Sequence, residues 1–450
     1  MNNRRYRGVK RQVEPKAIRT FGRIRIKEFD LNIAAVSILF WTIVIQSHSL
    51  RELIHPESDF VPDFFQDYAS ARNLRSGYPV YSSHIVTAPI YLNKSLDLTR
   101  SNVLLNAHPP TSILLAVPFS FLPFTQAFHA WNMVSFILVL LSLFITFREL
   151  NIQSTIWSVC FSLAILIFCG PLWEQTRQGQ LNAVLLLAIT IAWAADRSEN
   201  AAFAGMMIGI AASIKLFPIF FVFYFAWTKR YRSVMFAVLM FTLLTGIIWI
   251  LFGSGAFRDY LTIVLPDFQW FRVGWNNCSL AGFWSRLFDP IPGKTRLFSR
   301  SSPIIQSPLL FRFCYSLSAQ ILVAIVAIRL GRNVDRRTRD LGFGLCATTM
   351  LLINPISWEH SLIILIPFFI FVGRSIPWRF EFKTMMFLTI FFLFMMRPQL
   401  VWTLFSMGDR IASPLENLTI LPYQFYALLG FLSLQLILLK TSRQSIDSGI

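Results

Sequence analysis

The sequence predicts an all-α polytopic membrane protein, and its composition is the first reason. Hydrophobic residues make up 55% of its 450 residues and aromatic residues 15%, while only 14% are charged. A soluble domain carries roughly 25% charged residues, and a water-soluble fold of this length could not bury all 45 phenylalanines. Disorder is excluded because a disordered chain needs low hydrophobicity. The repeated apolar runs along the chain then predict many transmembrane helices.

The net charge of +18 is concentrated in a few basic segments, which predict the cytoplasmic side of the membrane. Residues 1–28 contain ten Lys and Arg residues against two Glu residues, and we expect them to form a basic cytoplasmic tail. Contact with anionic lipid headgroups and a solvated, disordered tail are both compatible with this composition. The other basic segments lie at 229–232, 329–340, 374–383 and 440–443.

The apolar runs define the expected helices in chain order. The first span covers about 31–45, and later runs cover roughly 109–124, 127–147, 152–170, 181–195, 201–214, 216–228, 233–252, 311–330, 341–353, 361–373, 384–396 and 421–439. The run 109–124 contains four prolines and either crosses the membrane or is re-entrant. The re-entrant version obeys the charge rule better and gives about 12 transmembrane helices with both termini in the cytoplasm.

This topology also sets the expected domains and outer loops. We expect a basic cytoplasmic tail at 1–28, one transmembrane domain at 29–440 and a short cytoplasmic C-terminal tail at 441–450. The alternation of sides places four polar segments outside, namely 48–108, 253–310, 354–360 and 397–420.

The first outer segment contains a predicted helix from Pro62 to Gly77, because Pro favours a first turn and Gly a helix end. Its apolar residues fall on one stripe, so we expect an amphipathic helix along the membrane interface. Asp63 and Asp67 lie four residues apart and share a face. Like charges at this spacing disfavour a helix, which suggests a use for at least one of them. For Asp63 alone, complementing the helix dipole is an equally good explanation.

Two polar features interrupt the apolar runs. The segment 173–182 brings Arg177, Gln180 and Asn182 together with other polar groups, which is costly beside lipid unless something polar binds there. A hydrated loop with an Asn cap would explain Asn182 alone. Lys215 stands in an otherwise uncharged apolar stretch, where an ionisable side chain suggests function and a Lys suits phosphate. Snorkelling of the Lys to the interface is the alternative.

Two further outer loops contribute candidates. Asn277 and Ser279 lie in a loop that mixes aromatic and amide side chains, and Glu359 and His360 lie at a membrane face beside a Trp. A lone His there is usually an interface residue, but its polar neighbours favour a functional role. The whole set suits a ligand with an anionic head and a lipid tail. A carboxylate would act as general base, and the cations would stabilise a departing phosphate.

The same residues resemble glycosyltransferase family 87, the polyprenyl-phosphate-mannose-dependent mannosyltransferases of the C-type membrane glycosyltransferase fold. The resemblance runs in family order over about residues 30–370. The matching pieces are Asp63-Phe64 with Tyr68-Ala-Ser-Ala, Gly77-Tyr-Pro-Val-Tyr81, His108-Pro109-Pro110, Gly179-Gln180-Leu181-Asn182, Ala204-Gly205 before Lys215-Leu-Phe-Pro218, Asn277-Cys278-Ser279-Leu280 with Gly282, and Ser357, Glu359 and His360.

The resemblance implies a lipid-linked sugar donor and an acidic catalytic base in the first outer loop. By position this base is Asp63. Asp67 is the runner-up. It stands where the family often has an aromatic residue, which is a first departure from the family pattern. Cys278 is a second departure, because a Gln is more usual there, and it affects the donor or acceptor contacts of that loop.

We therefore expect an inverting hexosyltransferase in the plasma (inner) membrane, with its active site on the outer face. It would move a hexose from a polyprenyl-phosphate donor to a glycan or glycolipid acceptor. Mannose is the expected sugar, and glucose and arabinose stay open. Donor phosphate or sugar contacts are expected from Arg177, Lys215, His360, Glu359, Gln180 and Asn182, and acceptor or loop contacts from Tyr68, Asn277 and Ser279.

Neither a metal, a cofactor nor a nucleic-acid partner is predicted, because the sequence has no nucleotide-binding motif or metal-ligand set. The alternative function is a flippase or transporter of lipid-linked saccharides. Such a protein would share the polar cavity but would not need a base at the interface.

Overall fold

The computed structural model describes residues 19–21, 24–26, 28–54, 60–94, 105–289, 301–330, 335–376, 378–405 and 410–447. Most of the expected basic tail at 1–28 lies outside these residues, as does the end of the expected C-terminal tail at 448–450. The described residues are predominantly α-helical, as predicted. They form two compact units.

Unit 1 comprises Met1–Ser47 and Gln153–Ile167. It contains the antiparallel strands β1 (Arg19–Phe21) and β2 (Ile24–Ile26), the helix α1 (Glu28–Ile45) and nearly all of α7 (Ile156–Phe168). The backbone N–H of Trp157 donates a hydrogen bond of 3.0 Å to the side chain of Asn32. This bond joins the first turn of α7 to α1.

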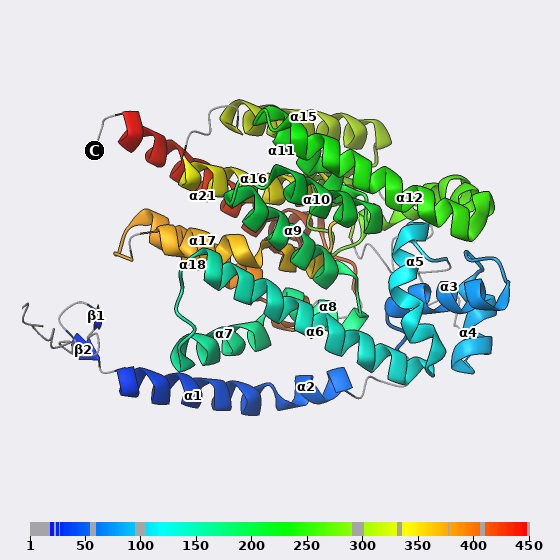
Figure 1. Ribbon diagram of the computed structural model, residues 1–450, viewed down its shortest axis with the longest axis horizontal. Helices are drawn as coiled ribbons and strands as arrows, with labels where there is room; N and C mark the ends of the chain where they lie inside the picture. Colours follow the sequence, from blue (N-terminus) through cyan, green and yellow to red (C-terminus); the bar gives the residue numbers. More distant parts are fainter. Residues whose placement is uncertain are drawn as a thin grey trace, which may run out of the picture. The chain divides into compact units, whose positions relative to one another are not determined.

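Unit 2 comprises His48–Ile152 and Phe168–Ile450 and carries the other helices (Figure 1). Its first elements are α2 (Ser47–Ile54), α3 (Phe64–Ser76), α4 (His84–Leu92), α5 (Pro110–Ala116), η1 (Pro118–Phe121), α6 (Phe124–Glu149), α8 (Gly170–Gln178), α9 (Asn182–Arg197) and α10 (Ala201–Ile214). The next are η2 (Phe217–Ile219), α11 (Phe220–Trp227), α12 (Tyr231–Asp259), η3 (Tyr260–Val264), α13 (Leu265–Phe268), η4 (Gln269–Val273) and α14 (Leu280–Phe288). The last are α15 (Pro308–Leu330), α16 (Arg336–Ile353), η6 (Glu359–Leu365), α17 (Ile366–Ser375), α18 (Phe382–Met395), α19 (Pro398–Leu404), α20 (Pro414–Thr419) and α21 (Tyr423–Asp447).

The core of unit 2 is built on helices that pack closely. α9 packs against α6 and α10, α10 against α12, and α16 against α21. A Cβ atom on Gly205 would lie 2.2 Å from the carbonyl oxygen of Ser233, and one on Gly209 would lie 2.5 Å from that of Ala237. The absence of side chains at these two positions lets the backbones of α10 and α12 approach each other, as small residues do between membrane helices.

Five described helical segments are long and apolar enough to cross a membrane, or up to seven if each of two bent helix pairs is one span. The expected count of 12 is therefore not confirmed. Several predicted runs are too short as helices: α10 has 14 residues, and the run 216–228 is divided between η2 and α11. At 1.5 Å per residue, such helices fall short of the roughly 30 Å hydrocarbon core of a bilayer.

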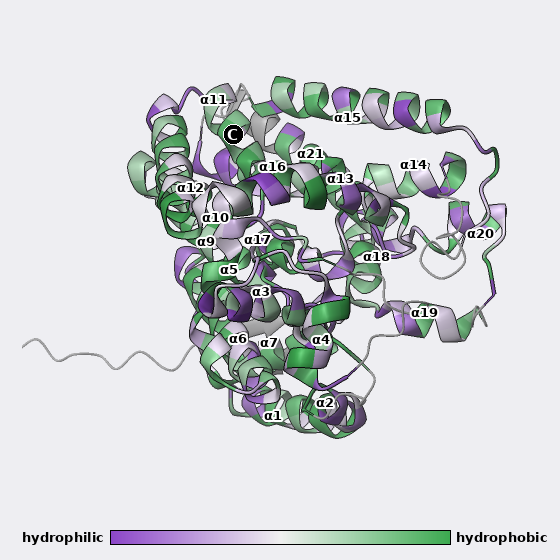
Figure 2. Ribbon diagram, turned by 90° about the vertical axis from the view of Figure 1, so that its right-hand side faces the viewer, coloured by the Kyte–Doolittle hydropathy of each residue, from purple (hydrophilic) through white to green (hydrophobic). Residues whose placement is uncertain are grey.

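Exposed apolar side chains on the long helices support a membrane location. On α15 the exposed residues Leu309, Phe313, Leu317 and Ile321 recur every four positions and so form one continuous stripe. Figure 2 likewise shows a mostly hydrophobic ribbon for α12. An apolar face of this length on a long helix is typical of contact with lipid.

The helices α3, α4 and α5 gather beside one end of α6 and α12 (Figure 1). α3 agrees with the predicted helix and ends as predicted at Gly77, whose φ of +73° is left-handed. Polar residues of α3 are buried as well as apolar ones, among them Gln66 and Asp67, so the protein itself covers part of its polar face. α5 has only seven residues, which favours the version in which the run 109–124 does not cross the membrane.

Candidate active site

A cavity of about 530 Å³ in unit 2 brings together residues that are far apart in the sequence. Its polar lining includes Asp63, Gln66, His108, Gln180, Lys215 and His360. Its apolar lining includes Phe217, Phe220, Phe223, Leu265 and Phe268. The lining of the cavity therefore combines ionisable and amide side chains with aromatic and aliphatic ones.

Asp63 stands immediately before the first turn of α3 and is half-buried. Its side chain does not cap the helix. Instead, Nε2 of Gln180 donates a hydrogen bond of 2.6 Å to its Oδ2. Burial raises the pKa of Asp63 above its ordinary value, and the hydrogen bond from Gln180 and the positive charge of Lys215 offset part of this effect. This carboxylate lines the cavity, with a pKa above that of an exposed Asp.

Gln180 is positioned by the end of α8. Gly179 has a left-handed φ of +62°, and a Cβ there would lie 2.8 Å from Cβ of Phe64 and 2.9 Å from the ring of Phe128. Its carbonyl oxygen accepts a 2.7 Å hydrogen bond from the indole of Trp131. Only a glycine suits this backbone conformation and this space. The turn that follows directs Gln180 toward Asp63.

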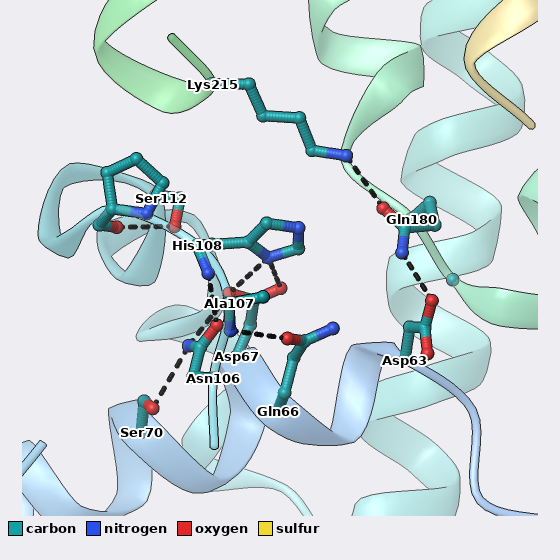
Figure 3. Close-up of polar contacts among 12 residues, drawn as sticks. Asp63, Gln66, Asp67, Ser70, Asn106, Ala107, His108, Ser112, Gln180 and Lys215 are labelled. Carbon is teal, nitrogen blue, oxygen red and sulfur yellow. Dashed lines mark hydrogen bonds and ion pairs between the residues drawn. The ribbon is translucent and has the colours of Figure 1, made fainter. Parts of the chain in front are cut away.

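Lys215 lies at a break between two helices, since α10 ends at Ile214 and a 3-10 turn begins at Phe217. Its Nζ donates to Oε1 of Gln180 at 2.8 Å and to Oδ1 of Asn182 at 3.2 Å. Figure 3 shows the resulting chain of contacts from Lys215 through Gln180 to Asp63. Lys215 thus lies on irregular backbone and lines the cavity. Irregular backbone within a membrane protein normally lines a cavity in this way.

Asp67 lies deeper than Asp63 and is only 1% exposed. Both of its carboxylate oxygens lie within 3.0 Å of Nδ1 of His108, at 3.0 and 2.9 Å. The amide of Asn106 donates a further hydrogen bond of 3.2 Å to Oδ1 of Asp67. Asp67 thus contacts the cavity through His108, which lines it.

Arg177, Glu174 and Glu359 belong to a neighbouring polar cluster, and none of them is among the described residues that line the cavity. Arg177 lies 3.6 Å from Glu174 and stacks over the ring of Phe60. Glu359 is buried and accepts a hydrogen bond of 3.2 Å from Asn276. Its neighbour His360 does line the cavity, so of the predicted Glu-His pair only the His faces this space.

The three remaining predicted residues fix loops and helices. The hydroxyl of Tyr68 donates to the carbonyl oxygen of Leu122 at 2.8 Å, under α3. Asn277 accepts hydrogen bonds from the backbone N–H groups of Ser279 and Ser357, at 3.1 and 3.0 Å. Ser279 caps α14. Asn277 thereby holds its loop against the segment before η6.

Several lining residues were not predicted from the sequence, including His108, Gln66, Arg272 and Tyr260. For His108 the signal was present, because it opens the His-Pro-Pro piece that resembles the family. Arg272 and Tyr260 lie in the segment 253–310, where the sequence has no distinguishing pattern around them. Among the described residues, no group of three or more His, Cys, Asp or Glu side chains could hold a metal ion.

Comparisons with known proteins agree with the resemblance in the sequence. A 263-residue segment is 27% identical to a polyprenol-phosphate-mannose-dependent alpha-(1-2)-phosphatidylinositol pentamannoside mannosyltransferase of Mycolicibacterium smegmatis, covering 58% of this chain and 59% of the relative. A protein of the same description from Mycobacterium tuberculosis is 27% identical over 268 residues, 59% of this chain and 57% of the relative. The chain thus matches less than two thirds of the length of these two relatives.

A polyprenol-phosphate-mannose-dependent alpha-(1-2)-phosphatidylinositol mannoside mannosyltransferase of Mycobacterium tuberculosis is 24% identical over 331 residues, 69% of each chain. No solved structure matches the chain. The model of glycosyltransferase family 87 matches residues 106–355, more than half of the chain, and includes His108, Gln180, Lys215 and Asn277. The protein therefore belongs to glycosyltransferase family 87.

Proposed function

We propose that this protein is a membrane hexosyltransferase that uses a polyprenyl-phosphate-linked sugar, with mannose as the first candidate. The acceptor would be a glycan or glycolipid on the outer face of the plasma membrane. Membership of family 87 and the names of the relatives, which depend on polyprenol-phosphate-mannose, support the donor class.

The observation that carries the proposal is the composition of the cavity. Asp63 and Lys215 line the same space as the aromatic side chains of Phe217, Phe220 and Phe223. A polyprenyl-phosphate sugar has the matching parts. Its phosphate would pair with the cation, its sugar would hydrogen-bond to the amides, and its isoprenoid chain would pack against the aromatic side chains. A transporter has no need of the carboxylate beside the sugar position.

In the proposed reaction, Asp63 accepts the proton of the acceptor hydroxyl while that oxygen forms a bond to the anomeric carbon. The bond from this carbon to the phosphate oxygen breaks, and its electron pair leaves with the polyprenyl phosphate. A single displacement inverts the configuration, so a β-linked donor gives an α-linked product. The raised pKa of Asp63 makes it a stronger proton acceptor than an exposed Asp.

The amide and cationic residues are assigned to the donor. Lys215 would neutralise the phosphate as a point charge, and His360 would approach it from η6. Gln180, which lines the cavity, would contact the sugar, and Asn182, which is buried behind it, would help to orient the Lys. Arg177 and Glu359 are assigned to the outer layer of the donor site, since they do not line the cavity among the described residues.

The test is to incubate the purified full chain with a panel of polyprenyl-phosphate sugars and a mixture of membrane glycolipids, and to follow the radiolabelled sugar. We expect transfer from the mannosyl donor, with an α-linked product. Liposomes that contain the protein are assayed in parallel for movement of the donor between leaflets. Movement of the intact donor without any cleavage or transfer would contradict the proposal and favour a transporter.

A further inference from the structure

His108 lines the cavity and is held there by the carboxylate of Asp67. Asp67 itself is not among the described residues that line the cavity. The ring is nearly buried, and its Nδ1 lies 3.0 and 2.9 Å from the two oxygens of Asp67. The same loop supplies Asn106, which donates to Asp67 at 3.2 Å and whose side-chain oxygen accepts from the backbone N–H of His108 at 2.9 Å. The orientation of the imidazole is therefore fixed from two directions.

This arrangement determines which nitrogen is available to a ligand. When Nδ1 donates its hydrogen to Asp67, Nε2 is the atom that remains for the cavity. Figure 3 shows the second ring nitrogen directed away from Asp67, toward the space between Lys215 and Gln180. No hydrogen bond to Nε2 from a described residue is recorded.

Hydrogen bonds other than the Asp67–His108 contact also attach α3 to its neighbours. Oε1 of Gln66 accepts a 2.8 Å hydrogen bond from the backbone N–H of Ala107, and the amide of Asn106 donates to Ser70 at 3.1 Å. Ser70 in turn donates to the carbonyl oxygen of Val80 at 2.8 Å. Neutral hydrogen bonds thus already join α3 to its neighbouring segments. Attachment of α3 alone therefore does not explain why an Asp and a His are buried together here.

We propose that His108 is a catalytic residue that binds the departing phosphate through Nε2 and gives it a proton, with Asp67 as its positioning residue. This inference rests on the proposed function, because it requires a phosphate-linked donor. It gives the second acidic residue of α3 a role at the leaving group and leaves the acceptor hydroxyl to Asp63.

The proton balance of the reaction favours such a residue. The donor phosphodiester carries one negative charge, and it would gain a second when the bond to the sugar breaks. A proton given by an imidazolium to the leaving phosphate oxygen prevents this second charge from developing, as in general acid catalysis by His. The acceptor's proton goes to Asp63, the Nε2 proton of His108 goes to the phosphate oxygen, and solvent restores both groups after product release.

The test compares three variants in the transfer assay with the full chain. His108→Gln removes the proton donor, Asp67→Asn keeps an acceptor for Nδ1 but removes the charge, and His84→Gln is the matched control. His84 is also a buried histidine, whose ring lies against Phe65, but it does not line the cavity among the described residues. We measure kcat, the donor KM and thermal unfolding of each variant.

We expect His108→Gln to lower kcat by about 100-fold or more, with a change in donor KM below about threefold, as for the loss of a general acid. Asp67→Asn should lower kcat in the same way with its thermal unfolding preserved, and His84→Gln should keep the wild-type kcat. If His108→Gln does not fold, the Asp67→Asn result decides, since a purely structural carboxylate would not change kcat in a folded enzyme.

Two results would overturn the inference while leaving the proposed function intact. One is wild-type kcat in His108→Gln or Asp67→Asn when the wild type transfers sugar. The other is a loss confined to donor KM, which would make His108 a ground-state binding residue only. Absence of transfer by the wild type from every donor would contradict the proposed function itself, and the inference with it.

Discussion

Gln180 connects Asp63 and Lys215, two charged groups of the cavity, because its amide donates to Asp63 and its carbonyl accepts from Lys215. An amide has both a donor and an acceptor, so it can bind an anion on one side and a cation on the other. The carboxylate and the ammonium group are therefore held near each other without a direct ion pair being recorded. The carboxylate of Asp63 can therefore accept a hydrogen bond from a substrate, and the ammonium group of Lys215 can donate one to an anionic substrate group.

The environment of Asp63 predicts the acid side of the pH profile. Because burial raises its pKa above the ordinary value of 3.8, transfer should decline as the pH falls through this raised value, since the base becomes protonated. Gln180→Leu removes a hydrogen bond that lowers the pKa of Asp63, so the decline should move to higher pH. The measurement is kcat/KM against pH for both proteins. A decline at or below the ordinary Asp range, or a shift to lower pH in the variant, would contradict this role.

Lys215 predicts a defect in donor binding. Lys215→Gln removes the positive charge from the cavity and should raise the donor KM about 10- to 100-fold, the range of a lost charge-assisted hydrogen bond. Lys229→Gln is the control, since Lys229 is exposed and does not line the cavity among the described residues. Equal donor KM values for Lys215→Gln and the wild type would refute the assignment of the phosphate to this Lys.

At the scale of residues, the sequence predicted several residues that line one cavity, but it did not predict their contacts. Asp63, Gln180 and Lys215 were each selected because polar groups are unusual in an apolar chain, and they do line one cavity. Arg177 and Glu359 met the same criterion but face a neighbouring cluster. Their exact positions depend on how α8 and η6 pack, and local pattern contains no information about that.

At the scale of elements, two helices end on glycines that differ in their surroundings. Gly77 ends α3 and Gly179 ends α8, both with a left-handed φ. Nothing would lie within 4 Å of a Cβ on Gly77, whereas a Cβ on Gly179 would meet Phe64 and Phe128 at 2.8 and 2.9 Å. The end of α3 was predicted from Gly77, but the close packing at Gly179 involves residues far along the chain and could not be predicted locally.

This pair of glycines gives a matched prediction. Gly77→Ala should destabilise the protein by about 1–2 kcal/mol, the cost of a left-handed Ala, and should leave transfer unchanged. Gly179→Ala adds an overpacking cost of about 1–3 kcal/mol and displaces Gln180, so both stability and transfer should fall. Thermal unfolding in detergent and the transfer assay test both effects. Equal behaviour of the two variants would contradict the importance of the packed turn.

The predicted number of about 12 spanning helices is not confirmed. Hydrophobic runs such as 201–214 and 216–228 were taken as spans because apolar composition predicts burial in lipid or in protein without distinguishing them. Ala204, Ile208, Ala211 and Ala212 of α10 are fully buried by other parts of the protein. Protein contacts, which the sequence pattern does not specify, replace lipid contacts there.

At the scale of the whole molecule, the concentration of Lys and Arg in a few segments predicts the side of each loop. In a chain whose five native cysteines are replaced by Ala, Asn93→Cys should react with a membrane-impermeant maleimide in intact cells. Lys229→Cys should react only after permeabilisation, and the cysteine-free chain is the control. Both positions are exposed. The opposite labelling pattern would contradict cytoplasmic termini and an outer active site.

The most direct test of the central claim is transfer by Asp63→Asn under single-turnover conditions with a labelled polyprenyl-phosphate mannose. Asn keeps an acceptor for Gln180, so folding and donor binding should be retained, while transfer should fall about 100- to 10,000-fold because the base is lost. Asp267→Asn makes the same change in charge at an exposed position and should behave as wild type. Wild-type transfer by a folded Asp63→Asn protein would contradict the account.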